Sequence, residues 1–268
     1  MPSTIAAFHR LHQSGCFVIP NPWDRGSAIY LQSLGFRALA TTSAGFAWSV
    51  GRPDNGVTVD QVLAHLKEIS SAVSVPVNAD FEGGFAREPN GVRANVARAV
   101  ATGIAGLSIE DSTGDERAPL FDVALARERI EAARAAIDAS GTGVLLAGRS
   151  EGFFVGRPDI KETIGRLEAY AAAGADCLYA PGIRTDADIA AVVRAVAPKP
   201  VNLLVAGDWI AFARAAELGV RRISVGGALA RAAWKGWTHA ARQIAEQGSF
   251  AGLASGGLPA IDLNRLFR

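Results

Sequence analysis

Acidic side chains gather where two predicted strands end. Asp80 and Glu82 close the strand-like run 75–80, and Glu110 closes the next run, which starts near Gly106. Residues i and i+2 of a strand point to the same side, so Asp80 and Glu82 can converge, and Glu110 arrives from the adjacent strand. Carboxylates this close raise one another's pKa values unless a cation shares them, and oxygen ligands suit Mg²⁺ or Mn²⁺. The pattern predicts a divalent metal site; solvated loop acids are the alternative.

An arginine stands at the end of the strand-like run 143–148. Arg149 would bring a guanidinium to the same edge as the three carboxylates, and arginine binds a carboxylate group through two parallel hydrogen bonds. We therefore predict that Arg149 holds an anionic substrate beside the metal. The alternative is a structural ion pair between Arg149 and Glu110 or Glu151, and both descriptions can hold at once.

Small and polar residues near other strand ends could bind the oxygen atoms of such a substrate. The run 41–46 follows the second predicted strand and leaves backbone N–H groups open to an oxyanion, although a plain turn would also use them. Gly226 and Gly227 follow the last predicted strand and could place an anion at a helix N-terminus. Asn202, in the strand-like run 200–205, is a further candidate for substrate binding, and Trp23 is the tryptophan predicted to lie near the active site.

These residues can lie close together only in a fold that brings many strand ends to one place. A recurring pattern in the sequence predicts such a fold. Four times a helical run ends in glycine and a short apolar or β-branched strand follows, as expected at helix-to-strand junctions. Alanine-rich helical stretches such as 123–138 and 158–173 lie between strands. Eight strands are predicted, starting near Cys16, Arg37, Val75, Gly106, Gly143, Asp176, Pro200 and Arg221.

Alternating strands and helices imply a parallel sheet, and eight repeats imply a closed α/β barrel of the (β/α)8 or TIM type. A doubly wound open sheet is the alternative, but its glycine-rich fingerprint after the first strand is absent. A chain of 268 residues is ordinary for one such barrel, so we predict a single domain over residues 1–268. Residues 248–268 are predicted to form a C-terminal helical extension that could pack on a neighbouring subunit.

The bulk composition favours a small-molecule ligand. Apolar residues make up 49% of the chain and charged residues 20%, which allows a sizeable core, and the net charge of +1 comes without a block of Lys or Arg. We therefore predict neither a nucleic-acid nor a membrane partner. The chain has no apolar run long enough for a signal peptide or a membrane span, so a cytoplasmic location is predicted.

The residues of two common nucleophilic mechanisms are not found at predicted strand ends. Cys16 and Cys177 lie in apolar strand-like runs and are predicted to be buried thiols. The four histidines fall outside the predicted strand ends. A Ser-His-Asp or Cys-His mechanism is accordingly disfavoured.

Taken together, the motifs resemble those of the isocitrate lyase/phosphoenolpyruvate mutase superfamily over roughly residues 5–245. The resemblance rests on the order of six short motifs and not on any one of them. They are Asn21-Pro22-Trp23-Asp24, Thr42-Ser43-Ala44-Gly45, Gly51-Arg52-Pro53-Asp54, Asp80-Phe81-Glu82-Gly83-Gly84, Ile109-Glu110-Asp111 and Gly148-Arg149-Ser150-Glu151.

The resemblance implies a barrel that forms a dimer or tetramer by exchanging its last helix, with Mg²⁺ (or Mn²⁺) held largely through waters. Members bind pyruvate-like groups and make or break a C–C or P–C bond at C3. Carried over by motif, the acids of the metal shell would be Asp80, Glu82 and Glu110, and the acid of the loop after the second strand would be Asp54. The substrate would contact Ser43, Ala44, Gly45 and Arg149.

The loop after the fourth strand departs from the best-known members. Isocitrate and methylisocitrate lyases carry Lys-Lys-Cys-Gly-His there, with the cysteine as acid/base, whereas residues 111–120 contain neither Cys nor His. The Lys and Asn that mutases use in this loop are not evident either, and Pro181 replaces the glutamate expected after the sixth strand. These differences disfavour tricarboxylate-type substrates and indicate a small oxo acid.

We therefore predict a Mg²⁺-dependent lyase or decarboxylase that cleaves a C–C bond of a small 2-oxo or 2-hydroxy dicarboxylate through a pyruvate-like enolate. The predicted catalytic residues are Asp54, Arg149 and Glu116, with Asp54, Glu116 or a bound water as the proton donor to C3. A phosphonopyruvate hydrolase or mutase, or a hydroxymethyltransferase, on the same enolate platform is one alternative. A non-catalytic oxo-acid-binding protein is another, because the loop residues are missing.

Overall fold

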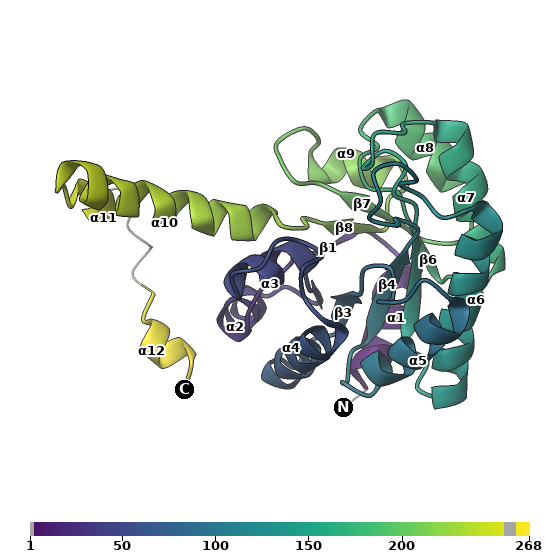
Figure 1. Cartoon of the computed structure of the whole chain (residues 1–268), viewed down its shortest axis with the longest axis horizontal. Helices are drawn as coiled ribbons and strands as arrows, with labels where there is room; N and C mark the ends of the chain where they lie inside the picture. The colour runs from purple at the N-terminus through teal and green to yellow at the C-terminus, as the bar shows by residue number, and fades with distance from the viewer. Residues whose placement is uncertain (1–2, 255–260) are drawn as a thin grey trace.

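Strands and helices alternate along the chain and bring the ends of eight strands to one edge (Figure 1). The computed structural model describes residues 3–254 and 261–268. In this part of the chain, neighbouring strands are parallel and follow the order β1-β8-β7-β6-β5-β4-β3-β2, which confirms the predicted eight-stranded α/β barrel. The strands are β1 (Phe17–Ile19), β2 (Leu39–Ala40), β3 (Val77–Asp80), β4 (Gly106–Glu110), β5 (Leu145–Arg149), β6 (Cys177–Tyr179), β7 (Val201–Leu204) and β8 (Arg222–Ser224).

Hydrogen bonds at the strand ends join β1 to β2. The Ala40 N–H donates to the carbonyl oxygen of Pro20, just past β1, at 3.0 Å. Asn21 is buried beside it and donates from Nδ2 to the carbonyl oxygen of Thr41 at 2.9 Å. Its Oδ1 accepts from two backbone N–H groups that follow β8, each at 2.9 Å. One amide side chain thus links three neighbouring strand ends at the rim where the site lies.

The helices around the barrel begin at residues suited to that position. Asp122 and Thr58 accept hydrogen bonds from the first turns of α6 and α4, which satisfies N–H groups that have no partner inside the helix. The predicted helical stretches 123–138 and 158–173 correspond to α6 and α7. The helices are α1 (Thr4–Gln13), α2 (Arg25–Ser33), α3 (Ser43–Ser49), α4 (Val59–Ala72), α5 (Pro89–Val100), α6 (Val123–Ser140), α7 (Ile160–Ala172), α8 (Asp186–Ala195), α9 (Phe212–Glu217), α10 (Ala228–Gln247), α11 (Ala251–Ala254) and α12 (Leu263–Leu266).

The interior of the barrel is only partly apolar. Phe8 of α1 packs with Phe17, Leu145 and other apolar residues in a buried cluster. Each of four buried polar residues stands two positions before the end of its strand, namely Asn78, Ser108, Asn202 and Arg222. Bulky branched apolar side chains dominate the interior of most such barrels. A polar layer at this depth therefore indicates a binding site above it.

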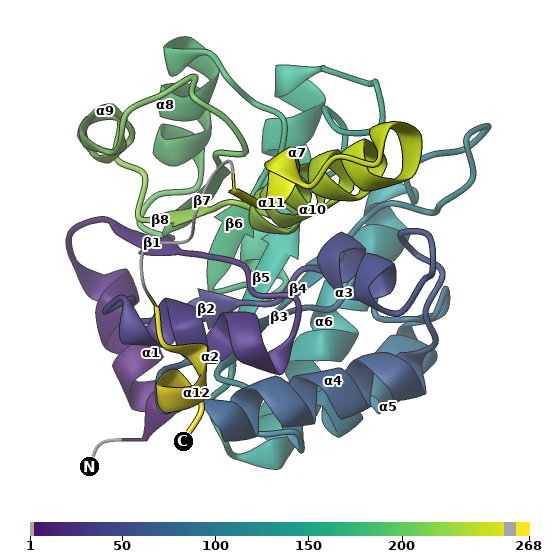
Figure 2. The same cartoon turned by 90° about the vertical axis from the view of Figure 1, so that its left-hand side faces the viewer.

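The C-terminal helix α10 projects from the barrel (Figure 1), and Figure 2 looks onto the side from which it projects. Its exposed Trp234 and Trp237 rings lie edge to face, with their centroids 5.0 Å apart. Of the predicted extension 248–268, residues 255–260 lie outside the described residues, and the described remainder contains α11 and α12. None of the described helices is both long enough and apolar enough to cross a bilayer.

Candidate active site

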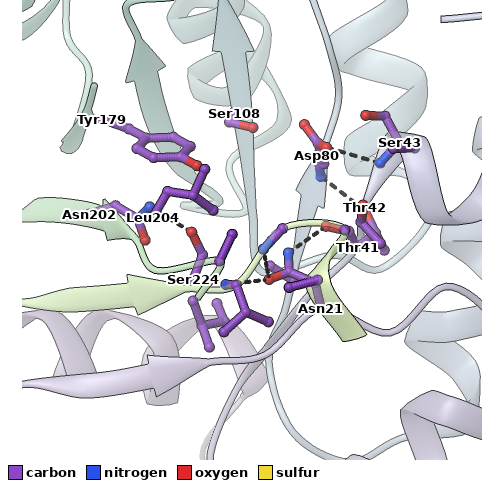
Figure 3. Close-up of a pocket in the computed structure, with 18 of the residues that line it drawn as sticks. Asn21, Thr41, Thr42, Ser43, Asp80, Ser108, Tyr179, Asn202, Leu204 and Ser224 are labelled. Carbon is purple, nitrogen blue, oxygen red and sulfur yellow. Dashed lines mark hydrogen bonds between the residues drawn. The ribbon is translucent and has the colours of Figure 1, made fainter. Parts of the chain in front are cut away.

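A cavity of ≈ 230 Å³ opens at the carboxyl ends of the strands (Figure 3). Its wall combines the ends of β3, β5, β6, β7 and β8 with the first residues of α3 and α10. This is the end of the barrel at which barrel enzymes bind their substrates. The predicted site residues that line it are Ser43, Ala44, Asp54, Asp80, Arg149 and Asn202.

Arg149, at the end of β5, contacts three of the acids at the strand ends. Its Nη1 lies 3.2 Å from Oδ1 of Asp80 and 3.2 Å from Oε2 of Glu110, and its Nε donates to Glu151. Burial lowers the pKa of Arg149, but the Glu151 and Glu110 carboxylates outweigh it and raise the pKa well above its ordinary value. The structural ion pair is thus present, and the same side chain lines the cavity where a substrate anion would bind.

Asp80, at the end of β3, is held by the loop after β2. Its Oδ2 accepts a hydrogen bond from the Ser43 N–H at 3.0 Å (Figure 3). Its own backbone N–H donates to Oγ1 of Thr41 at 2.9 Å. Because Ser43 is the first residue of α3, the carboxylate lies at the N-terminus of that helix. Asp80 is therefore fixed between α3 and Arg149.

Glu82 and Glu110 line a second cavity of ≈ 310 Å³. Among the described residues, Oε1 of Glu82 is buried without a hydrogen-bond partner. Burial, and then the charges of Asp80 and Asp54, raise the pKa of Glu82 to about 8. Burial also raises the pKa of Glu110 well above its usual value, although the charge of Arg149 lowers it. The three acids predicted to bind the metal therefore repel one another, although Asp80 lines the first cavity and Glu82 and Glu110 line the second.

These acids do not form a closed cage of direct metal ligands. Within residues 3–254 and 261–268, no group of three or more His, Cys, Asp or Glu side chains is placed to hold a metal ion. An ion held largely through waters needs acids with free oxygens in its second layer. The unpartnered Oε1 of Glu82 fits this arrangement, as does the raised pKa of Asp54, because a cation would relieve the repulsion among these carboxylates. The donors are all oxygens, which suits Mg²⁺ or Mn²⁺.

A buried network behind β4 and β5 holds Glu151 in place. Asp111 Oδ1 accepts from the Glu151 N–H at 2.8 Å, and Asp111 Oδ2 accepts from the Tyr170 hydroxyl at 2.5 Å and from Arg166 Nη1 at 3.3 Å. Asp111, Glu151 and Arg166 are all buried. Since Glu151 contacts Arg149, this network sets the position of the guanidinium in the cavity.

The loop after β2 divides into residues that face the cavity and residues that pack behind it. Ser43 and Ala44 line the cavity, whereas Gly45 and Trp23 are not among the lining residues of either cavity. A Cβ atom at Gly45 would lie 2.6 Å from Cγ2 of Thr42 and 2.9 Å from Cβ of Trp23, so close packing against both residues accounts for the glycine. The N–H groups of Ser43 and Gly45, expected to be open, donate to Asp80 and Thr42.

The N-terminus of α10 forms another part of the wall. Gly226, Gly227 and Ala228 line the cavity, and no side chain caps the helix. The Gly226 N–H already donates to Asn21, so of the two predicted glycines it is Gly227 that could offer its N–H to an anion. Arg231, one turn into the helix, also lines the cavity and lies 4.6 Å above the centroid of the Trp48 ring. This second arginine at the cavity was not predicted.

The two predicted proton donors lie in different surroundings. Asp54 is exposed at the cavity rim, and partial desolvation and the Asp80 charge raise its pKa, while a hydrogen bond from Ser43 lowers it. Glu116 is exposed in the loop between β4 and α6 and is not among the lining residues of either cavity. A bridge between Ser112 and Leu120 closes the base of this loop. Of these two residues, Asp54 is therefore the one that lines the main cavity.

Sequence reasoning missed several polar residues of the cavity. Some of them could have been predicted from the alternation of side chains along a strand. Asn78 and Ser108 precede Asp80 and Glu110 by two residues and therefore point to the same side. No histidine or cysteine is among the described residues that line the two cavities. The missed lining residues are Asn21, Asn78, Ser108, Tyr179, Arg222, Ser224 and Arg231.

Known proteins match this chain over most of its length. The phosphoenolpyruvate phosphomutase family matches residues 8–245, a range that includes every cavity residue named above. An uncharacterised protein of Mycobacterium tuberculosis (strain ATCC 25618 / H37Rv) is 33% identical over 242 residues, which are 90% of this chain and 89% of that protein. The 2-methylisocitrate lyase of Escherichia coli (strain K12) is 32% identical over 162 residues, which are 58% of this chain and 54% of that enzyme.

Solved structures share the whole fold. A Burkholderia cenocepacia J2315 protein, assigned only broadly as a lyase or mutase, is 44% identical with a TM-score of 0.94, and the match covers 98% of this chain and 96% of that one. The crystal structure of 2,3-dimethylmalate lyase is 28% identical with a TM-score of 0.87, covering 100% of this chain and 96% of that one.

Proposed function

Because the chain belongs to the isocitrate lyase/phosphoenolpyruvate mutase superfamily, we propose that it is a Mg²⁺-dependent enzyme that cleaves a C–C bond of a small 2-oxo or 2-hydroxy dicarboxylate. Members of this superfamily are lyases, mutases and decarboxylases that work on a pyruvate-like enolate. The observation that carries the proposal is the contact of Arg149 with both Asp80 and Glu110 at the cavity. In this contact, an arginine that can bind a substrate anion lies beside two of the acids that would bind Mg²⁺.

The acids that would hold the metal are Asp80, Glu82 and Glu110. Their fit rests on the free Oε1 of Glu82 and on its raised pKa, because burial and then the charges of Asp80 and Asp54 raise the pKa of Glu82 to about 8. When bound, Mg²⁺ supplies a positive charge that polarises the 2-oxo and carboxylate oxygens of a substrate.

The chain's own residues orient the substrate. Arg149 binds a carboxylate, and its position is fixed through Glu151 and the Asp111 network. Ala44 at α3 and the uncapped N-terminus of α10 offer backbone N–H groups to oxygens on the other side of the cavity. The reacting end of the substrate is then held from two sides of the cavity.

Asp54 is the candidate proton donor to C3. As the C3 substituent departs, its bonding electron pair stays on the substrate as an enolate, and C3 must then take up a proton. The pKa of Asp54 is raised by partial desolvation and by the Asp80 charge, so Asp54 retains a proton at higher pH than an ordinary aspartate. Glu116 remains the second candidate, and it requires the loop after β4 to move toward the cavity.

The partners we propose are a small 2-oxo acid and further copies of this chain in a homodimer or homotetramer. The helix α10 supports the second, because it projects with exposed apolar residues that include Trp237, 63% exposed. Large exposed apolar patches mark interaction sites. Exchange of this C-terminal helix between subunits would cover them.

The activity is tested with a panel of substrates. Oxaloacetate, substituted malates and phosphonopyruvate are incubated with the enzyme in Mg²⁺ or in EDTA, and release of 2-oxo acid and of phosphate is measured. We expect Mg²⁺-dependent C–C cleavage of at least one dicarboxylate. Phosphate release alone would favour a phosphonopyruvate hydrolase, and tight binding without turnover would favour an oxo-acid-binding protein.

A further inference from the structure

The deeper part of the main cavity contains an arginine whose charge has no acidic partner. Arg222, on the inner face of β8, lines the cavity and is only 3% exposed. Its Nε donates to Oδ1 of Asn202 at 2.8 Å, and its Nη1 lies 3.3 Å from Oδ1 of Asn78. Both partners are neutral amides. Among the described residues, Arg222 takes part in no ion pair.

The nearest histidine does not compensate this charge. Nδ1 of His12 lies 2.8 Å from the carbonyl oxygen of Phe8, so Nδ1 carries a proton and donates it, and Nε2 is an acceptor at 3.5 Å from Nη1 of Arg222. Burial, and then the charge of Arg222, lower the pKa of His12 to about 3. His12 is therefore neutral at physiological pH, and Arg222 remains the charged group of this layer.

The arginine is also short of acceptors. A guanidinium has five N–H donors, and among the described residues Nη2 of Arg222 has no hydrogen-bond partner. Some of the described side chains have fully buried atoms without a hydrogen-bond partner, but Nη2 of Arg222 is not one of these atoms. The Arg222 side chain lines the cavity. Nη2 is thus the end of the guanidinium that a ligand in the cavity can reach. Burying an unpaired charge is costly, so a ligand anion would relieve a real deficit.

The cavity reaches this depth because small side chains surround the arginine. Ala40, the register partner of Asn78, and Ser108 both line the cavity, where other barrels have bulky branched residues. Asn202, which holds Arg222, also donates to Oγ of Ser224 at 2.9 Å (Figure 3). The pocket around Nη2 is therefore polar and open from above.

The depth of Arg222 sets the length of a ligand that reaches it. Asn78 stands two residues before Asp80 on β3, so the side chains that contact Arg222 and Arg149 lie about 7 Å apart along that strand. A four-carbon dicarboxylate spans roughly 6 Å between its outermost oxygens, whereas oxalate spans only about half of that. An ion as short as oxalate cannot contact both layers.

We infer that Arg222, positioned by Asn202 and Asn78, binds the distal carboxylate of a four-carbon dicarboxylate whose other end lies beside Arg149. This rests on the proposed function and names its substrate class more closely. Arg222 gives ligands whose second carboxylate points into the barrel a higher affinity than monocarboxylates or oxalate. Arg149 and the acids at the strand ends bind the proximal end of every such ligand.

Calorimetric titration with succinate and with oxalate, both in Mg²⁺, tests this inference. Arg222→Met should weaken succinate binding about tenfold or more and leave oxalate binding within about twofold of the wild type. Arg221→Met is the matched control, because Arg221 directly precedes β8 and donates to the Gly15 carbonyl outside the cavity. It should bind both ions as the wild type does.

Two further measurements keep the inference falsifiable if Arg222→Met fails to fold. Arg222→Lys keeps the charge and should retain weakened succinate binding, and wild-type protein should be stabilised against heat by succinate but not by butyrate. Equal succinate binding by folded Arg222→Met and wild type, or equal stabilisation by butyrate, would overturn the inference. The proposed function fails separately, if no dicarboxylate is cleaved although succinate binding depends on Arg222.

Discussion

Nη1 of Arg149 lies 3.2 Å from Oδ1 of Asp80 although β4 separates their strands, β5 and β3. The same nitrogen lies 3.2 Å from Oε2 of Glu110 on the intervening strand. One guanidinium nitrogen therefore spans the ends of three strands. Loss of this group removes the proposed anion site and leaves buried carboxylates without a counter-charge.

We expect Arg149→Met to lower kcat/KM for the dicarboxylate substrate by about 100- to 1,000-fold, the usual effect of losing a charge-stabilising group. Arg149→Lys should recover little, because an ammonium group cannot form the paired hydrogen bonds of a guanidinium. Steady-state kinetics of both variants beside Arg127→Met, an exposed position on α6, provide the measurement. Retention of more than about a tenth of the activity in Arg149→Met would contradict the assigned role.

Glu82 should couple metal binding to proton release. With a pKa of about 8, its carboxyl holds a proton at pH 7 in the metal-free protein, and Mg²⁺ must displace it. We expect binding at pH 7 to release close to one proton and Mg²⁺ affinity to rise between about pH 6.5 and 8.5. Calorimetry in buffers of different ionisation enthalpy measures the release.

The matched variant Glu82→Gln should release no proton and bind Mg²⁺ about 10- to 100-fold more weakly. Glu128→Gln on the exposed face of α6 is the control. The stability of the metal-free protein changes with pH in the opposite direction to its Mg²⁺ affinity. Because folding raises the pKa of Glu82 from 4.5 to about 8, the metal-free protein loses stability as the pH rises through this range. A proton release unchanged in Glu82→Gln would assign the titration to another group.

Much of this site follows from patterns that a single sequence carries. The spacing of Asp80 and Glu82 and the repeated helix-to-strand junctions were enough to place the acids and Arg149 at one end of a barrel, because parallel strands end at the same edge. Strand and helix bounds shifted by a few residues, as in α7, since the exact ends depend on caps such as Asp159.

Other features depend on tertiary contacts that local patterns do not encode. Arg221 and Arg222 are adjacent, and only the register of β8 within the closed barrel decides which one points inward. Gly45 is predicted to contact the substrate; it is not among the residues that line the two cavities, and Thr42 and Trp23 leave no room for a side chain there. The side chain of Glu82 follows a backbone with a φ of 45°, so the strand geometry used for its prediction does not continue to that residue.

His65 should make the fold sensitive to acid. It stacks on Phe46 with ring centroids 4.0 Å apart, and its Nε2 is buried without a partner among the described residues. Burial lowers its pKa to about 4 from 6.5, so the unfolded chain takes up a proton at higher pH than the folded chain does. The stability is complete above pH 6.5 and is lost as the pH falls toward 4.

We expect this residue to cost about 2 kcal/mol of unfolding free energy between pH 7.5 and pH 5. Urea unfolding at both pH values should show a smaller loss for His65→Leu than for the wild type, whereas His239→Leu, on the exposed face of α10, should lose as much as the wild type. Equal losses for His65→Leu and the wild type would assign the acid sensitivity elsewhere.

The exposed tryptophans of α10 should control assembly. Trp237 is 63% exposed, and a glutamate there would place a charge in the proposed contact between subunits. We expect Trp237→Glu to lower the mass measured by light scattering to that of fewer subunits. Lys235→Glu puts the same side chain about half a turn away on the helix and should leave the mass unchanged. A wild-type protein that is monomeric at high concentration would contradict the proposed oligomer.

The most direct measurement is a crystal structure grown with Mg²⁺ and oxalate. We expect one metal ion between Asp80 and the free oxygens of Glu82 and Glu110, with at least part of its shell made of water at about 2.1 Å, and oxalate bound between that ion and Arg149. Oxalate bound without a metal, or a metal remote from these three carboxylates, would contradict it.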